Sequence, residues 1–191
     1  MTGTADRHTE IVAATRNWLE RAVIGLNLCP FAKAVHVKGQ VRYVASAAQT
    51  DCALLDDLER ELSFLADAAP EAVDTTLLIT PDVLTDFAAF TDFLDLAEVV
   101  LRNQGLAGTL QIASFHPDYV FADAPAEDIG NYTNRAPYPT LHLIREASLA
   151  RATAAFPDAA DIYRRNIDTL QRLGIEGWRA LAVDAAARPK P

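Results

Sequence analysis

Strand-like runs separated by long helical patterns constrain the fold of this chain more than any other feature. Residues 41–46 (VRYVAS) alternate and are rich in β-formers, residues 75–80 (TTLLIT) form a continuous apolar run, and residues 109–116 (TLQIASFH) form a third strand. An amphipathic helix is predicted between each pair, the first over residues 51–68. Two strand–helix–strand crossovers in succession predict at least three parallel strands with helices packed against the sheet.

Capping residues predict where the other helices begin and end. Thr80 followed by Pro81 is typical of an N-cap and a first helical position, so the second crossover helix is expected to begin there. Asp158 is expected to cap a last helix that runs through Leu173 and stops at Gly174. An N-terminal helix is indicated by apolar residues at helical spacing, namely Ile11, Trp18, Ala22 and Leu26.

The remaining elements complete one domain. Residues 140–145 (TLHLIR) are predicted to form a fourth strand, followed by a helix to about Phe156. We therefore expect an α/β fold, with α+β as the alternative. Its single mixed, mostly parallel sheet has about four strands with helices packed on it. The domain is expected to span residues 7–183, with residues 1–6 and 184–191 as flexible termini.

Composition excludes several classes of function. The 191 residues are 50% hydrophobic, enough for a substantial core, and carry a formal net charge of −9, which argues against nucleic acid as a partner. No run approaches the roughly 18 apolar residues of a membrane span, and the N-terminal MTGTADRHTEIVA lacks the plan of a signal peptide. Cys29 and Cys52 are the only cysteines, so no disulfide framework is implied and we expect a reduced, cytoplasmic protein. The oligomeric state is left open.

A long segment between the last two strands indicates where a site lies. Residues 117–139 (PDYVFADAPAEDIGNYTNRAPYP) have the pattern of at most one short helix, at about 126–131. Connections this long in a compact domain are usually functional or disordered. The aromatic and apolar content of this one argues for an ordered loop that covers something.

Polar residues in and beside this loop are candidates for binding. His116 ends the third strand, where ligands gather in open sheets, although a structural hydrogen bond to a loop carbonyl explains it equally well. Arg135, with Asn131 and Asn134, suits a carboxylate or phosphate; the alternative is that the asparagines satisfy turn backbone and Arg135 pairs with a loop carboxylate. Tyr119 joins them as a substrate-binding candidate.

Two residues of the fourth strand have mainly structural interpretations. Arg145 is followed by Glu146, which favours an ion pair, and it is kept as a further anion-binding candidate. His142 alternates with Leu141 and Leu143, so it is expected to face the opposite layer as a sheet-face histidine.

Cys29, in GLNLCPFAKAV, has three interpretations. As a nucleophile it needs a lowered pKa, which a short helix opening at Pro30 would favour, with Lys33 one turn away. As a redox centre it is monothiol, because CPFA lacks a second cysteine. As structure it is a small buried hydrophobe.

Metal and cofactor motifs are weak or missing. Cys29, His116, Asp118 and His142 are all ligand types, but no C-x-x-C or H-E-x-x-H spacing is present, so we assign no metal ligand. Glycine-rich nucleotide motifs and G-x-S-x-G are also missing, and we expect no cofactor.

Three blocks, LNLCPFA, ASFHPDYVFA and NYTNRAPYPTLHLIRE, together resemble a bacterial family catalogued as domain of unknown function 1415. The resemblance extends from the Trp18 helix to the helix after Arg145. It implies a soluble, bacterial, single-domain protein and assigns no catalytic residue.

Three hypotheses of function follow. The first is an enzyme acting on a small anionic molecule: Cys29 is the nucleophile or thiol acid–base, His116 its proton partner, and Arg135 with Asn131 the anchor. Such an enzyme is a cysteine- and histidine-dependent hydrolase, transferase or monothiol redox enzyme. The second is a non-catalytic module that binds a small molecule or a protein through the aromatic loop. The third is a zinc-binding protein.

Overall fold

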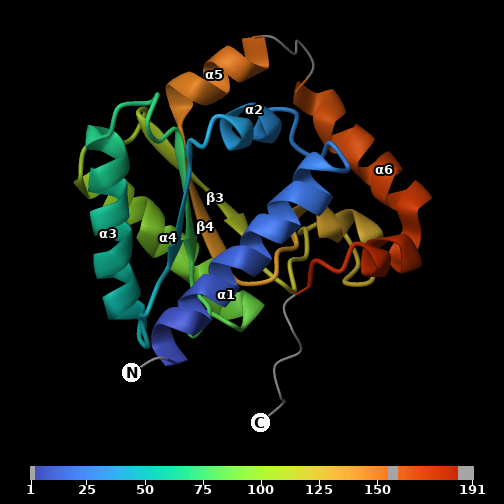
Figure 1. Cartoon of the computed structure of the whole chain (residues 1–191), viewed down its shortest axis with the longest axis horizontal. Coiled ribbons are helices and arrows are strands. Elements are labelled where there is room, and N and C mark those ends of the chain that lie inside the picture. Colours follow the sequence, from blue (N-terminus) through green and yellow to red (C-terminus); the bar gives the residue numbers. More distant parts are fainter. Residues whose placement is uncertain (1–2, 155–158, 185–191) are drawn as a thin grey trace.

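The computed structural model describes residues 3–154 and 159–184 of the chain (Figure 1). Its elements are α1 (Gly3–Trp18), the π-helix η1 (Leu19–Ile24), α2 (Ala32–Val37), β1 (Val41–Ala45), α3 (Asp51–Asp67), β2 (Thr75–Ile79), α4 (Phe87–Asn103), β3 (Leu110–Phe115), the 3-10 helix η2 (Ile129–Asn134), β4 (Thr140–Arg145), α5 (Glu146–Ala154) and α6 (Ala159–Ala180). All four predicted strands are confirmed, to within one residue at each end.

The four strands form one mixed sheet in the order β1-β2-β4-β3. β1 pairs in parallel with β2, with Val41 opposite Thr75, whereas β4 runs antiparallel to both of its neighbours. β1, β2 and β3 therefore share one direction, as the two crossovers predicted, but β4 lies between β2 and β3. The α/β class with a mixed four-stranded sheet is confirmed.

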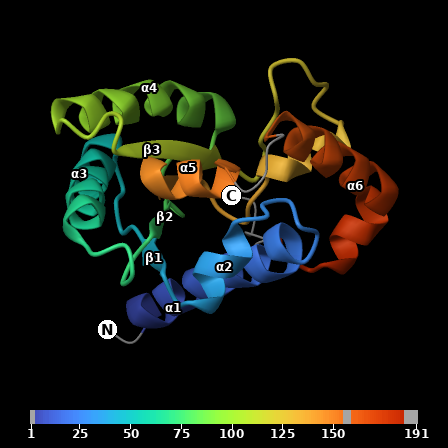
Figure 2. The ribbon, with the colours of Figure 1, turned by 90° about the horizontal axis from the view of Figure 1, so that it is seen from above.

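Helices cover the two faces of the sheet in different ways. α3 and α4 pack on one face, where Leu78, Leu141 and Leu143 are completely buried against leucines of α3 and phenylalanines of α4. α1, η1 and α2 lie on the other face, on the side of the sheet opposite α4 (Figure 2). The second core cluster is on this side, around Trp18 and Trp178.

The beginning of α4 differs from the sequence-based expectation. The helix begins at Phe87, after Asp86, whose side chain accepts a hydrogen bond from the backbone N–H of Ala89. Thr80 is instead buried, and its backbone N–H donates to the carbonyl of Pro139. This tertiary contact outweighs the local preference of Thr80 and Pro81 for a helix start.

Gly174 interrupts α6, as its place in the sequence predicts. It has φ 67°, ψ 172°, which is not helical, and a second helical segment follows it to Ala180. The continuation is stabilised by Trp178, which is 2% exposed and packs edge-on against Tyr132 at 5.0 Å. The expected N-cap, Asp158, lies outside the described residues. Within the described ranges, no helix combines the length and apolar character needed to cross a bilayer.

Candidate ligand-binding site

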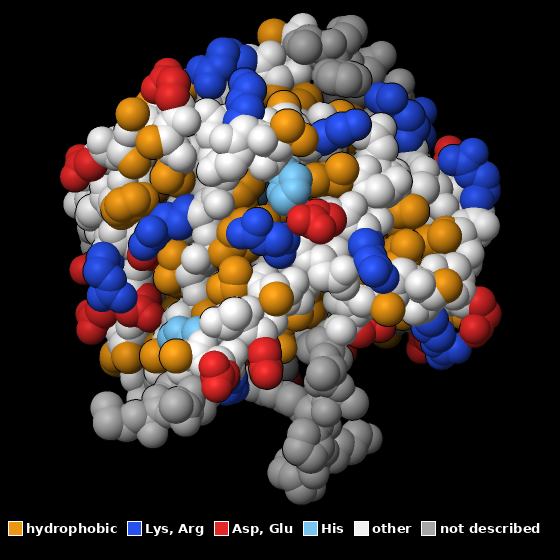
Figure 3. Space-filling view, viewed as in Figure 1, with side chains coloured by type: hydrophobic (Ala, Val, Ile, Leu, Met, Phe, Trp, Pro, Cys, Tyr) orange, Lys and Arg blue, Asp and Glu red, His pale blue; other side chains and the backbone are white. Residues whose placement is uncertain are grey.

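A cavity of about 720 Å³ lies between the sheet and the helices on the α1 side; we call it the sheet cavity. Its floor is formed by side chains of the strands, Val41, Leu77, Ala113, Phe115, His142 and Ile144. Its walls come from α1 and η1, from residues 29–32, 34 and 35, and from α5. Apolar side chains reach the surface between charged ones on this side of the molecule (Figure 3). One face of the sheet is therefore filled by α3 and α4, whereas the other is only partly filled.

Polar side chains lie at the rim of the sheet cavity. Arg151 donates to the hydroxyl of Ser148 at 2.8 Å, and this hydroxyl donates to a carboxylate oxygen of Asp74 at 2.6 Å. Lys38, at the end of α2, also lines the cavity, and no side-chain partner is found for its ammonium among the described residues. The charged groups that line the cavity are thus two cations, the engaged Arg151 and the uncommitted Lys38, and two carboxylates, Glu71 and Asp74.

His142 lies on the floor of the sheet cavity, on the face that strand alternation predicted. Its Nε2 is 2.7 Å from the hydroxyl oxygen of Thr75, and this hydroxyl lies 2.6 Å from the carbonyl oxygen of Leu143. Burial lowers the pKa of His142 from 6.5 to about 4, so the ring is neutral at pH 7. A neutral histidine can act there as a hydrogen-bonding group but not as a permanent cation.

Cys29 lies in the turn between η1 and α2 and lines the same cavity. Backbone hydrogen bonds from Phe31 and Ala32 favour its thiolate, but burial is the larger effect and raises the pKa of the thiol. α2 begins at Ala32 rather than at Pro30, and the exposed Lys33 is not among the lining residues. The thiol is therefore placed to meet a bound molecule while remaining protonated at neutral pH.

His116 lies on the opposite face of the sheet from Cys29. It is fully buried, with its ring 5.2 Å and 5.1 Å from those of Phe87 and Phe90 of α4. Its Nε2 donates to the carbonyl of Leu84 at 3.1 Å, and its Nδ1 accepts from the backbone N–H of Asp118 at 3.0 Å. Burial lowers the pKa of His116. The structure does not bring His116 and Cys29 together, and it gives His116 the structural contact to a loop carbonyl.

Asn131 and Asn134 hold the 117–139 loop in shape. The side chain of Asn131 is buried; it accepts from the backbone N–H of Phe121 at 3.0 Å and donates to the carbonyl of Pro125 at 2.8 Å. Asn134 donates to the carbonyl of Ser114 in β3 at 3.3 Å. Both amides are thus used by backbone of the loop and of its neighbouring strand.

Arg135 and Tyr119 also contact the loop itself. Arg135 donates to the carbonyls of Tyr119 at 3.3 Å and Ala126 at 3.1 Å, and its guanidinium lies 4.1 Å from the ring centre of Tyr132. The ring of Tyr119 packs against Phe87 and Phe121. Neither Arg135 nor Tyr119 is among the described residues that line the sheet cavity.

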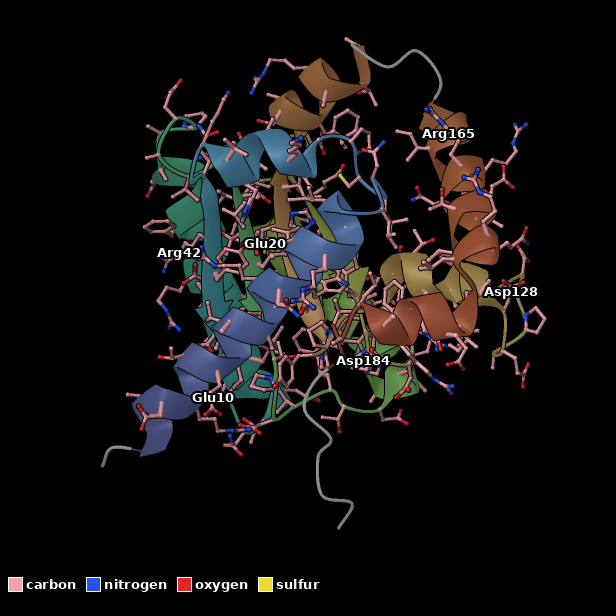
Figure 4. The ribbon with its side chains drawn as sticks, turned by 45° about the vertical axis from the view of Figure 1, so that its right-hand side comes forward. Glu10, Glu20, Arg42, Asp128, Arg165 and Asp184 are labelled. Atoms are coloured by element: carbon pink, nitrogen blue, oxygen red, sulfur yellow. The ribbon has the colours of Figure 1, made fainter. Side chains whose placement is uncertain are left out.

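The loop is ordered, as its composition predicts, but it packs against helices. The indole N–H of Trp18 donates to the carbonyl of Arg135 at 2.8 Å, and Tyr132 contacts Trp178 of α6. Its short helix is η2, three residues later than expected. Figure 4 shows Asp128, at the start of η2, on the side of the molecule that α6 covers, away from Glu20.

Arg145 stabilises the end of α3 rather than forming the expected ion pair. It is buried, and its guanidinium donates to the carbonyls of Leu65 and Ala68, both at 2.5 Å, and of Val73. Leu65 lies in the last turn of α3 and Ala68 is its C-cap, where a cation is favourable, whereas Val73 lies in the segment before β2.

No metal centre is formed by the described part of the chain. Within residues 3–154 and 159–184, no three or more His, Cys, Asp or Glu side chains are grouped so that they could hold a metal ion. Of the four residues considered from the sequence as metal ligands, Cys29 and His142 lie on the cavity face of the sheet and His116 lies on the α4 face.

Sequence reasoning missed Thr75 and Lys38 as site residues, and it considered His142 only as a sheet-face histidine or as one of four metal-ligand types. The available signal was a pair of polar residues in the apolar strands β2 and β4, Thr75 and His142, on the face opposite Leu78 and Leu141. Lys38 carried no such signal, because its place at the rim depends on how α2 crosses the sheet.

Comparison with known proteins gives a family but no characterised relative. No curated protein and no solved structure matches the chain. A family model described as "Protein of unknown function (DUF1415)" matches residues 10–180, from α1 to the end of α6, and this range includes all three sequence blocks. The chain therefore belongs to the DUF1415 family.

Proposed function

We propose that this protein binds a small molecule with an apolar body and an anionic end in the sheet cavity. The observation that carries the proposal is the cavity itself, about 720 Å³ over the sheet face opposite α3 and α4. Small-molecule sites typically have volumes of about 300–1,000 Å³, mostly apolar walls and a few polar groups. The cavity has all three properties.

Lys38 is the reason for expecting an anionic group on the ligand. Its ammonium lies at the rim and has no partner among the described side chains, whereas Arg151 is already engaged with Ser148. A carboxylate, sulfonate or phosphate at the rim would pair with it, while the apolar body of the ligand packs on Leu77 and Phe115.

Two fluorescent probes test this proposal. 8-Anilinonaphthalene-1-sulfonate has an apolar body and an anionic group, and N-phenyl-1-naphthylamine lacks the sulfonate. We expect both to bind saturably with one molecule per chain. Lys38→Gln should weaken binding of the sulfonate probe by about two- to fivefold and leave the affinity for the neutral probe unchanged. Lys33→Gln, on the same short helix but outside the cavity, is the matched control.

A substitution that fills the cavity tests its location. Ala113→Trp places an indole on the cavity floor and should reduce the affinity for both probes by about tenfold or more, because it occupies ligand volume. Ala88→Trp on the exposed side of α4 should have no effect. Unchanged probe binding in folded Ala113→Trp would overturn the proposal.

The second candidate is an enzyme in which the thiol of Cys29 reacts with the bound molecule. Its support is the position of Cys29 on the cavity wall and the two backbone N–H groups that favour its thiolate. His142 lines the same cavity, but its pKa of about 4 makes it a weak base, so in this candidate the thiolate forms as the pH rises rather than by proton transfer to a histidine.

An activated ester tests the enzyme candidate. With p-nitrophenyl butyrate, the thiolate of Cys29 would attack the ester carbonyl, the butyryl group would transfer to sulfur, and p-nitrophenolate would leave. We expect a burst of one equivalent of p-nitrophenolate and a mass increase of one butyryl group, both lost in Cys29→Ser. Cys52→Ser, which removes the exposed thiol of α3, is the control. An equal burst from Cys29→Ser would exclude this role.

A further inference from the structure

The hydrogen bonds of Thr75 fix the protonation state of His142. A hydroxyl has one proton, and the carbonyl oxygen of Leu143, at 2.6 Å, can only accept it. The hydroxyl of Thr75 therefore donates to Leu143 and accepts from His142, at 2.7 Å. Nε2 of the neutral His142 must carry the proton, because the reverse arrangement would leave two lone pairs facing each other.

With the proton on Nε2, Nδ1 of His142 is a hydrogen-bond acceptor. No described residue donates to it. His142 is half-buried and lines the sheet cavity, and its Nε2 is already engaged with Thr75. Nδ1 is therefore the ring nitrogen left for a molecule bound in the cavity.

The side chains beside His142 in the sheet are apolar and offer no hydrogen-bond donor to Nδ1. In the sheet, His142 lies opposite Leu77 of β2 on one side and Ala113 of β3 on the other, and both line the cavity floor. A purely apolar ligand packed there would remove water from Nδ1 and give it no donor, which is unfavourable. Burial also lowers the pKa of His142 to about 4, which keeps this lone pair free at neutral pH.

We infer that the molecule bound in the sheet cavity carries a hydroxyl or N–H group on its apolar body and donates it to Nδ1 of His142. The inference rests on the proposed ligand-binding function and adds the class of ligand: an amphipathic molecule with a donor within its apolar part. Thr75 is then a positioning residue, because it sets the ring tautomer through Nε2 without contact to the ligand at Nδ1.

Two isomers of identical composition test the donor requirement. 4-Propylphenol has a hydroxyl donor, whereas 4-ethylanisole has the same atoms and only an ether acceptor. By calorimetric titration at pH 7 we expect the phenol to bind about three- to tenfold more tightly. Equal affinities would overturn the inference and leave the cavity proposal intact. If neither isomer and neither naphthyl probe binds, the inference and the proposed function are both overturned.

Substitutions of Thr75 separate its positioning role from a packing role. Thr75→Val keeps the shape but frees the proton of His142 to move to Nδ1, so the preference for the phenol should fall toward unity. Thr75→Ser keeps the hydroxyl and should retain the preference. A full preference in folded Thr75→Val would contradict the assignment of Thr75.

The tautomer can be observed without any ligand. Long-range 1H–15N correlation spectra of the unsubstituted protein at pH 7 should show His142 with its proton on Nε2 and an unprotonated Nδ1. A proton on Nδ1 would overturn the inference even if the probes bind. This measurement does not depend on a variant that folds.

Discussion

Phe115 and His116 are consecutive residues whose side chains lie on opposite faces of the sheet. The ring of Phe115 packs edge-on against Trp18 at 5.0 Å, on the side of the sheet cavity. The ring of His116 contacts Phe87 and Phe90 of α4 on the other side. The end of β3 therefore contributes to both layers, and His116 belongs to the filled one.

This position predicts that His116 contributes to stability rather than to binding. His116→Phe retains a ring of similar size but leaves the carbonyl of Leu84 and the N–H of Asp118 without their partner. We expect a loss of about 1–3 kcal/mol in the free energy of unfolding by urea. Affinity for the naphthyl probes should be unchanged, and a large loss of probe binding in the folded variant would refute this assignment.

The buried imidazole of His142 predicts a pH dependence of stability. Its pKa is about 4 in the folded chain and 6.5 in the unfolded chain, so between these values the unfolded state binds more protons. The free energy of unfolding should therefore decrease as the pH falls below 6.5. The histidine's share should be about 2 kcal/mol by pH 5 to 4.5.

His142→Phe provides the control for this effect. The carboxylates titrate in both proteins, so the difference between the two pH profiles isolates His142. The profile of the variant should be flatter between pH 6.5 and 4.5. Parallel profiles would show that His142 has a normal pKa in the folded protein.

Substitution of Arg145 is expected to reduce stability more than substitution of most other charged residues. Arg145→Met retains the volume of the side chain but removes the donors to three carbonyls near the end of α3, including those of Leu65 and Ala68. We expect a loss of about 2–4 kcal/mol in urea unfolding. Arg172→Met, on the exposed side of α6, should change stability by less than about 0.5 kcal/mol.

Gly25 is required where η1 ends. A Cβ at this position would lie 2.2 Å from the carbonyl oxygen of Arg21, which is backbone and cannot move aside without opening the π-helix. Gly25→Ala should cost more than about 2 kcal/mol and also weaken probe binding, because the turn that carries Cys29 begins here. Gly39→Ala is the comparison: it has open space around it and only the strain of its φ of 69°, about 1 kcal/mol.

The raised pKa of Cys29 predicts slow alkylation. In Cys52→Ser protein, iodoacetamide should modify Cys29 slowly at pH 7, and the rate should continue to rise above the pH at which an ordinary thiol levels off. Saturating N-phenyl-1-naphthylamine should slow the reaction further. Fast modification that the probe does not affect would place the sulfur outside the ligand's reach.

The strands, α3 and the ordered loop could be predicted because their signals are local. The alternation of Leu141, His142 and Leu143 identifies the two faces of β4 without any tertiary information. No local rule, however, identifies which face of the sheet Cys29 shares. That depends on the side of the sheet that α1 crosses.

The sheet cavity itself could not be predicted from the sequence. It is space left between strands, η1, α2 and α5, and no residue pattern records the spacing between segments so far apart in the chain. The role of the polar loop residues could not be predicted for a related reason. Asn131 and Arg135 suit a ligand anion as well as they suit backbone carbonyls, and only the fold decides which they meet.

The position of β4 has a consequence for synthesis of the chain. β4 is the last of the four described strands to leave the ribosome, yet it lies between β2 and β3. Until residue 145 has emerged, the inner edges of both strands have no partner, and exposed strand edges favour pairing between chains. Cotranslational folding of this protein therefore cannot complete its sheet strand by strand; the centre closes last, in one late step.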